Sequence, residues 1–474
     1  MTEGVAGYWY SRFVFERALA LVYLIAFLCA ANQFVPLLGE RGLMPISRFV
    51  RVVPFYSSPS LFYAYTGDAA VRAAAWIGVA LASLALTNYP QQWGTMFSAG
   101  VWAALWILYL SFVNVGQTFY GFGWESLLLE TGFLAMFLGG SATPPAAPSI
   151  WLYRWVLFRV MFGAGMIKLR GDPCWRDLTC LNYYFETQPI PNPLSWYFHW
   201  LPHGIHRAGV VFNHISELAV PFLYFTPQPF AAVGGLLTIA FQSVLILSGN
   251  LSWLNWITVV LCIPTLDDRW WAWLPLGPPA VMVQSVAHRM VVFGLTLVVA
   301  LLSIGPTLNI LSAGQLMNYS FNPIHLVNTY GAFGSITRVR NEIVIEGTQD
   351  AVVTDKTEWR EYEFKGKPGD LSKRPAQIAP YHLRLDWLMW FAAMSTPDEY
   401  PWFTALLAKI LQGDRDTLGL LRTNPFPDAP PRWVHAVYYE YRFTTPAEYR
   451  QTGQWWKRRA IGEFMPPVAL RRPK

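Results

Sequence analysis

Polar side chains gather in residues 168–193, directly behind the apolar run Ile150 to Ile167. The candidates for binding or chemistry in this loop are Lys168, Arg170, Asp172, Trp175, Arg176, Asp177, Glu186 and Gln188. A lysine amine can act as a base or a hydrogen-bond donor, and carboxylates and guanidinium groups can hold a polar partner. Because polar groups are costly to bury at a membrane boundary, this concentration predicts a functional loop.

Lys168 has two interpretations. As a catalytic base it would need desolvation in an apolar pocket, which favours the neutral amine. As a structural residue at a helix end, it would extend its ammonium group to the membrane interface. Arg170 and Asp172 likewise form either an ion pair that stabilises the loop or part of a recognition surface.

Cys174 and Cys180 lie six residues apart in the same loop. They form a disulfide if the loop faces an oxidising compartment, and they are free thiols if it faces the cytosol. Cys29 and Cys262 fall within apolar runs, which predicts that they are small core residues.

A second polar group, Asn213, His214 and Glu217, stands at the start of another apolar run. We expect Asn213 to cap a helix and Glu217 to lie one turn inside it. A buried carboxyl group must be hydrogen-bonded, so this group is either a structural cap or part of a functional polar site.

Ionisable residues also occur within two neighbouring apolar runs: Glu125 and Glu130 in one, Arg154 and Arg159 in the next. Unpaired charges at membrane depth are expensive, so we expect carboxylates and guanidinium groups to pair between the two helices. These pairs either hold the bundle together or line a polar cavity that leads towards Lys168.

No metal site is expected. His199, His203 and His206 have helical spacing, but Pro202 and Gly204 interrupt the helix and no ligand set is completed. The sequence also contains no cofactor motif.

No nucleic-acid partner is expected either. The basic stretches at 457–459 and 471–474 are short and fit a solvated edge or a lipid-headgroup contact, although the chain carries a net charge of +6.

The composition identifies the elements that must position these residues. The chain has 474 residues, of which 54% are hydrophobic and only 14% charged, against about 25% charged in an ordinary soluble domain. We predict membrane helices at about nine apolar runs: Phe13 to Val35, Val71 to Thr87, Thr95 to Val113, Ser126 to Gly140, Ile150 to Ile167, Ile215 to Phe225, Phe230 to Leu247, Trp253 to Ile263 and His288 to Ile304.

Residues 307–474 hold 21 of the 35 Lys and Arg residues, so we divide the chain into a transmembrane domain at 1–306, which includes the polar loop at 168–212, and a water-soluble domain at 307–474.

The C-terminal domain changes periodicity. Alternating segments rich in Val, Ile, Tyr and Trp predict strands at Glu342 to Glu346, Glu358 to Phe364, His382 to Trp387 and Val434 to Phe443. Apolar spacing predicts one helix at Pro401 to Gln412. The predicted fold is therefore an α-helical polytopic membrane bundle followed by an extracytoplasmic, mostly-β domain.

The orientation follows from Arg12 and Arg17, which precede the first run and predict a cytoplasmic N-terminus. An odd number of spans then places both the polar loop and the C-terminal domain in the lumen or periplasm.

Several longer strings resemble the lipase maturation factor family over nearly the whole chain. They are KLRGDPCWRDLTC with ETQPIPNPLSWY, Asn213-His214 with Glu217, Asn318-Tyr319, Glu346-Gly347-Thr348, Trp359 with Glu361 to Lys365, Arg384-Leu385-Asp386-Trp387, Asn424-Pro425-Phe426 and Trp455-Trp456. The resemblance implies a polytopic endoplasmic reticulum membrane protein whose lumenal regions help lipases such as lipoprotein lipase to fold, dimerise and gain activity. The implied partners are a client lipase or another exported protein, together with membrane lipid.

A more distant likeness concerns residues 160–184, which are similar to the part of the vitamin K-dependent gamma-carboxylase that carries its catalytic lysine. Lys168 occupies the matching position. That enzyme also uses a histidine on an earlier membrane helix, whereas the comparable stretch here, GFGWESLLLETG at 121–132, has none. The alternative that this likeness implies is a membrane enzyme that uses Lys168 as a base on a lipid, quinone or protein substrate.

Three hypotheses therefore remain: a folding factor, a membrane enzyme and a transporter. The family resemblance favours the folding factor, with no cofactor, and a transporter would show an inverted repeat that the sequence lacks. Candidate client contacts are Trp359, Trp387, Trp390, Trp455 and Trp456, although any single one of them is more typical of core packing. Low lysine content with abundant Ala, Arg and Trp is typical of a bacterial protein, which would lie in the inner membrane.

Overall fold

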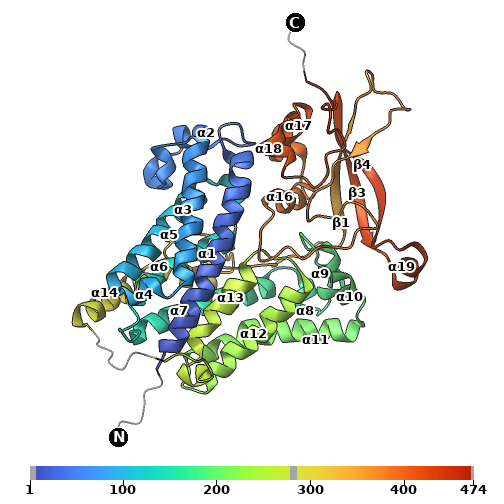
Figure 1. Cartoon of the computed structure of the whole chain (residues 1–474). Helices are drawn as coiled ribbons and strands as arrows, with labels where there is room; N and C mark the ends of the chain where they lie inside the picture. The colour runs from blue at the N-terminus through green and yellow to red at the C-terminus, as the bar shows by residue number, and fades with distance from the viewer. Residues whose placement is uncertain (1–6, 278–284, 471–474) are drawn as a thin grey trace.

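The computed structural model describes residues 7–277 and 285–470, and the basic stretch at 471–474 lies outside them (Figure 1). Seven helical segments among these residues are long and apolar enough to cross a membrane. They are α1 (Trp9–Leu38), α3 (Asp68–Leu86), α5 (Thr95–Val115), α7 (Ala147–Arg170), the segment His203–Phe225, α12 (Phe230–Ser248) and the segment Val286–Leu311. The chain is therefore a multi-pass membrane protein.

Two of the nine predicted runs form helices shorter than a regular spanning helix. They are α6 (Gly123–Ala135), with 13 residues, and α13 (Leu254–Cys262), with 9 residues. At about 1.5 Å of rise per residue, neither helix by itself has the length of the roughly 30 Å hydrocarbon core. Both are largely buried among other helices, and an apolar run has the same composition whether lipid or protein surrounds it.

The segment His203–Phe225 is not a regular helix. It begins as α11 (His203–His214), continues as the π-helix η4 (Ile215–Ala219) and ends as the 3₁₀ helix η5 (Val220–Phe225). Pro221, in the first turn of η5, has no N–H to donate to the preceding turn, which explains the change of helical form. The expectation that Asn213 caps a helix is wrong, because Asn213 lies inside this continuous segment.

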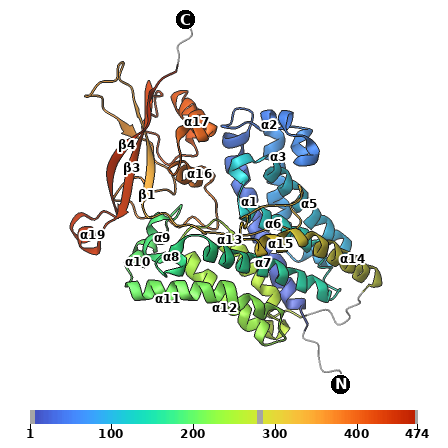
Figure 2. The same ribbon diagram turned by 180° about the vertical axis from the view of Figure 1, so that it is seen from behind.

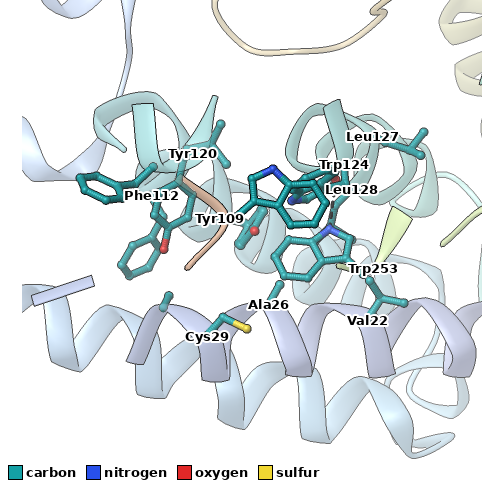
Figure 3. Close-up of a cluster of buried hydrophobic side chains, with 14 of the residues drawn as sticks. Val22, Ala26, Cys29, Tyr109, Phe112, Tyr120, Trp124, Leu127, Leu128 and Trp253 are labelled. Atoms are coloured by element: carbon teal, nitrogen blue, oxygen red, sulfur yellow. Dashed lines mark hydrogen bonds between the residues drawn. The ribbon is translucent and has the colours of Figure 1, made fainter. Parts of the chain in front are cut away.

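The core of the bundle forms around α1, which packs against α3, α5, α6 and α13. Figure 3 shows part of this core, where the indole Nε1–H of Trp253 donates to the carbonyl oxygen of Trp124 at 3.1 Å. Cys29 and Cys262 are both buried, as predicted for small core residues.

The C-terminal region contains one antiparallel sheet with the strand order β2-β1-β3-β4. The strands are β1 (Arg340–Thr348), β2 (Arg360–Glu361), β3 (Trp433–Phe443) and β4 (Trp456–Val468). The predicted strands within β1 and β3 are confirmed, and the one predicted at 358–364 is reduced to the two residues of β2. The helix predicted at Pro401 to Gln412 is confirmed as α17 (Pro401–Leu411).

The strand predicted at His382 to Trp387 is wrong. These residues lead into α16 (Arg384–Ala392), which lies between the sheet and the bundle in both views (Figures 1 and 2). Seven of its nine residues are buried, so its polar and apolar residues do not separate into an exposed and a buried face. Alternation over a few such residues therefore does not discriminate a strand from a helix.

The polar loop contacts the sheet region directly. Its helix α10 (Ser195–His199) carries Trp196, whose indole N–H donates to the carbonyl oxygen of Thr444 at 2.8 Å. The loop and the sheet therefore lie on the same side of the bundle. Their extracytoplasmic placement and the domain division at 306/307 stay predictions.

Candidate functional site

Lys168, Asn213 and Glu217 form one hydrogen-bonded group. The Lys168 Nζ donates to Glu217 Oε1 at 2.5 Å and to Asn213 Oδ1 at 3.0 Å, and Asn213 Nδ2 donates to Glu217 Oε2 at 2.8 Å. All three side chains are buried. The first residue of the predicted loop and the second polar group therefore belong to a single site.

Two irregularities bring these residues together. Glu217 lies in the π-helix η4, a helical form that is frequent at functional sites. Gly165 on α7 allows η4 to approach closely, since a Cβ there would lie 2.7 Å from Leu218 Cδ2 and 3.0 Å from Glu217 Cβ. The last turn of α7 can then place the Lys168 ammonium group against the Glu217 carboxylate.

The group borders a cavity of about 580 Å³ between the bundle and the C-terminal region. The wall opposite the membrane helices is aromatic and includes Trp387, Trp390 and Phe391 of α16. Trp124 at the start of α6 and Trp175 of the polar loop add further indole rings. The site therefore combines a polar ion-paired group with a mostly apolar enclosure.

A second polar group lines the same cavity. Asn255 Nδ2 donates to Gln242 Oε1 at 2.6 Å, and Gln242 Nε2 points to the sulfur of Met161 at 3.3 Å. A thioether sulfur is a weak acceptor, so the amide N–H₂ of Gln242 retains donor capacity.

The loop residue Trp175 connects the site to His214. The Lys168 Nζ lies 5.0 Å from the centre of the Trp175 ring, and His214 Nε2 donates to the Trp175 carbonyl oxygen at 2.9 Å. A disulfide joins Cys174 to Cys180 on either side of this residue, with their Cα atoms 4.8 Å apart. The disulfide therefore restrains the part of the loop that forms the cavity wall.

Other residues of the predicted functional loop make structural contacts. Arg170 donates to the carbonyl oxygen of Ile310 at 2.7 Å, and Arg176 to that of Leu169 at 2.9 Å. Asp177 is exposed. An ion pair between Arg170 and Asp172 was one of the two interpretations of these residues, and the structure gives each of them other partners.

Asp172 accepts from the backbone N–H of Cys174 at 3.0 Å, and so caps the short helix α8 (Pro173–Arg176). It also forms an ion pair with Arg338 at 2.7 Å. Hydrogen bonds from Arg338 lower the pKa of Asp172 to about 2, so this carboxylate is charged at neutral pH.

Glu186 and Gln188 join the loop to neighbouring elements. Glu186 is buried, accepts from the Phe443 N–H of β3 at 2.7 Å and pairs with Arg442 at 3.2 Å. Gln188 donates to the carbonyl oxygen of Ser248 at the end of α12 at 2.8 Å. Their contacts position the loop against the sheet and the bundle.

The predicted pairing of charges inside the bundle is half right. Glu130 of α6 pairs with Arg159 of α7, and Arg159 also donates to the Asn328 carbonyl oxygen at 2.6 Å. Glu125, however, pairs with Arg384 of α16 at 2.7 Å instead of with an arginine of α7. Arg154 donates to neutral groups, among them the carbonyl oxygen of Pro264 at 3.0 Å.

Sequence reasoning missed the aromatic wall. Trp387 and Trp390, two of the candidate client contacts, line the cavity. Trp455 and Trp456 are buried in the core of the sheet region, the other role predicted for these tryptophans. Trp387 and Trp390 are three residues apart, and this spacing places two side chains on one face of a helix. A helix prediction for this segment would therefore have put both indole rings on the same side.

The arrangement places a hydrogen-bond donor beside an apolar enclosure. Lys168 Nζ, Glu217 and Asn213 are held together by three hydrogen bonds at the edge of the cavity. Within residues 7–277 and 285–470, no three His, Cys, Asp or Glu side chains converge as metal ligands.

Comparison with known proteins covers both parts of the chain. The family model of the lipase maturation factor transmembrane domain matches residues 10–273, and that of the C-terminal domain matches residues 326–466. No solved structure matches the chain.

Named relatives align along almost their whole length. Lipase maturation factor 1 of Bos taurus is 44% identical over 98% of this chain and 89% of the relative, and that of Homo sapiens is 42% identical over 98% and 88%. Lipase maturation factor 2 of Homo sapiens is 28% identical over 99% of this chain and 84% of the relative. The chain belongs to the lipase maturation factor family.

Proposed function

We propose that this protein is a membrane-embedded maturation factor for secreted lipases. The observation that carries the proposal is the 44% identity to Lipase maturation factor 1 of Bos taurus, which extends over 98% of the chain. Both the helical bundle and the sheet region take part in that similarity. The client would be a lipase or another exported protein that reaches its active form in contact with this chain.

The proposed site of action is the lumenal or periplasmic side of the membrane. That compartment is the endoplasmic reticulum lumen for a eukaryotic source and the periplasm for a bacterial one. The disulfide between Cys174 and Cys180 supports this side, because disulfides persist in oxidising compartments.

Membrane-impermeant maleimide labelling tests the orientation. Arg176→Cys reports on the loop and Glu463→Cys on the sheet, and both positions are exposed. The unsubstituted chain is the background control, since Cys29 and Cys262 are buried. Labelling of both variants from the extracytoplasmic side is expected, and labelling of either one only from the cytosol would reject this orientation.

A rescue assay tests the function itself. The chain is expressed together with a secreted lipase in cells that lack their own lipase maturation factor, and lipase activity is divided by the amount of secreted lipase protein. We expect this specific activity to rise above that of cells with an empty vector. Lipase maturation factor 1 of Mus musculus, a relative of 42% identity, serves as the positive control for the assay.

A variant shows that the rescue requires the folded chain. Arg384→Ala removes the ion pair between α16 and the bundle, lowers the amount of folded protein and should therefore abolish the rescue. If the intact chain reaches the correct membrane and side but leaves the specific activity of several lipases unchanged while the mouse relative restores it, the proposed function is wrong.

A further inference from the structure

The cavity beside Lys168 is large enough for one small molecule and is lined by both polar and apolar side chains. Its volume of about 580 Å³ lies within the range of about 300–1,000 Å³ that single-ligand sites occupy. We propose that this cavity binds one neutral lipid, whose carbonyl oxygen accepts a hydrogen bond from Lys168 and whose chain lies against the aromatic wall.

The walls favour an apolar body with a small polar end. Trp124, Trp387, Trp390 and Phe391 present large apolar surfaces on one side. Lys168 and Gln242 bring nitrogen donors to the other side. A ligand must therefore be amphipathic, with its polar atoms directed at the membrane helices and its apolar part at α16.

The charges of the site favour a neutral ligand. Among the described residues that line the cavity, Lys168 and Glu217 alone are charged, and their opposite charges are 2.5 Å apart. A fatty acid carboxylate would add a negative charge close to Glu217 with no further cation to balance it. In a site of low dielectric constant this imbalance is costly, whereas an ester or ketone carbonyl adds none.

The hydrogen-bond inventory favours an acceptor on the ligand. Lys168 has three N–H donors, and Glu217 and Asn213 accept two of them. The Gln242 amide, whose N–H₂ contacts the weak acceptor Met161, supplies a further donor. The described polar groups of this region thus offer donors that a carbonyl oxygen would satisfy.

The location of the cavity favours the membrane as the source. Ala164 of α7 and Leu245 of α12 belong to candidate spanning helices and line the cavity, so the cavity extends between helices that would be in contact with the bilayer. Acylglycerols and isoprenoid quinones share the required chemistry, a neutral carbonyl joined to an apolar chain, and the experiment below distinguishes them.

Photolabelling of the purified full-length chain tests the proposal. The probe is a monoacylglycerol with a diazirine in its acyl chain, and peptide mass spectrometry locates the adducts. We expect saturable labelling of residues on the aromatic wall, and competition by unlabelled monoolein but not by oleate. If ubiquinone competes at a lower concentration than monoolein, the preferred carbonyl lipid is a quinone.

Two variants with a matched control complete the test. Lys168→Met removes the donor, and the loss of a charged hydrogen bond should weaken binding about tenfold or more. Ala164→Phe fills part of the cavity without altering the ion pair, and Ala73→Phe makes the same change at an exposed position of α3. We expect Ala164→Phe to lose the labelling and Ala73→Phe to retain it.

Three results would overturn the proposal. They are equal labelling in Ala164→Phe and the unsubstituted chain, competition by oleate as strong as that by monoolein, and the absence of saturable labelling. No lipase is present in this assay, so its result does not depend on the proposed maturation function.

Discussion

Two buried ion pairs of this protein have the same chemistry but different surroundings. Lys168 and Glu217 border the cavity, whereas Glu125 and Arg384 lie in the packed interface between α6 and α16. Each pair joins segments that are distant in the sequence. The comparison separates a pair that connects two parts of the fold from a pair that faces a space for a ligand.

The interface pair is tightly enclosed. Arg384 is fully buried, donates to the Phe119 carbonyl oxygen at 2.7 Å and lies 3.4 Å from the centre of the Tyr120 ring. Its backbone N–H donates to Gln33 of α1 at 3.0 Å, so α16 is bonded to two helices of the bundle. Lys168 and Glu217, in contrast, have the cavity on one side, where none of the described side chains packs against them. The residues around a buried ion pair therefore decide whether it stabilises the fold or faces a bound ligand.

The largest expected effect comes from Arg384→Ala. The substitution leaves the Glu125 carboxylate buried without its cation, and breaking such a pair typically costs about 3–5 kcal/mol. We expect little folded protein, measured by size-exclusion chromatography in detergent after stepped heating.

The double variant Glu125→Gln/Arg384→Met is the control for this prediction, because it removes both charges together. It should recover much of the lost stability. Equal instability of the single and double variants would show that packing around Arg384, and not the unpaired charge, is responsible.

Loss of the disulfide should have the next largest effect. Cys180→Ala opens a short loop, and the chain-entropy relation predicts a cost of about 2 kcal/mol. Since the disulfide restrains the Trp175 wall, ligand labelling should also fall. Non-reducing peptide mapping of the unsubstituted chain checks the premise, which two free thiols at Cys174 and Cys180 would contradict.

Lys168→Met should lower the free energy of unfolding by about 1–2 kcal/mol, less than Arg384→Ala or Cys180→Ala. The Glu217 carboxylate keeps its hydrogen bond from Asn213 and borders the cavity, whereas Glu125 is enclosed in a packed interface. Thermal unfolding of the purified Lys168→Met and Arg384→Ala proteins measures the difference in stability. A loss of stability as large as that of Arg384→Ala would remove the distinction between the two pairs.

The smallest effect concerns pH. Burial lowers the pKa of His199 in the loop to about 4, below its ordinary value near 6.5. Between these two values the unfolded chain binds a proton that the folded chain resists, so stability should fall as the pH falls from 6.5 to 4.

His199→Gln should weaken that dependence, and His203→Gln, at an exposed position, should not. Part of the dependence should persist in His199→Gln, because burial also lowers the pKa of His325 to about 4. Melting temperatures between pH 7 and pH 4.5 measure the difference, and identical curves for all three proteins would reject the assignment to His199.

Parts of the fold could be predicted from local pattern. Seven of the nine apolar runs form helices of spanning length, and the alternation in Glu342 to Glu346 and Val434 to Phe443 predicted two strands of the sheet. The pattern was insufficient at α6 and α16, because both helices are buried on almost every side. Periodicity reports on a boundary between environments, and these segments have none.

The candidate site shows the same limit. Lys168 and Trp175 were selected because they follow an apolar run, and Asn213 and Glu217 because they stand at the start of one, where polar residues are costly to bury. Glu186 was selected for the same reason but bonds to β3, since composition does not tell which polar residues will face a cavity.

The amino-acid sequence by itself determined that this protein is a membrane bundle with a β-containing C-terminal region, because hydropathy and periodicity are local properties. Only the tertiary structure decided that Lys168 pairs with Glu217, 49 residues away, and that Glu125 pairs with Arg384, 259 residues away. The cavity forms where α7, η4 and α16 converge. Such convergence depends on the packing of distant segments, which no single stretch of sequence encodes.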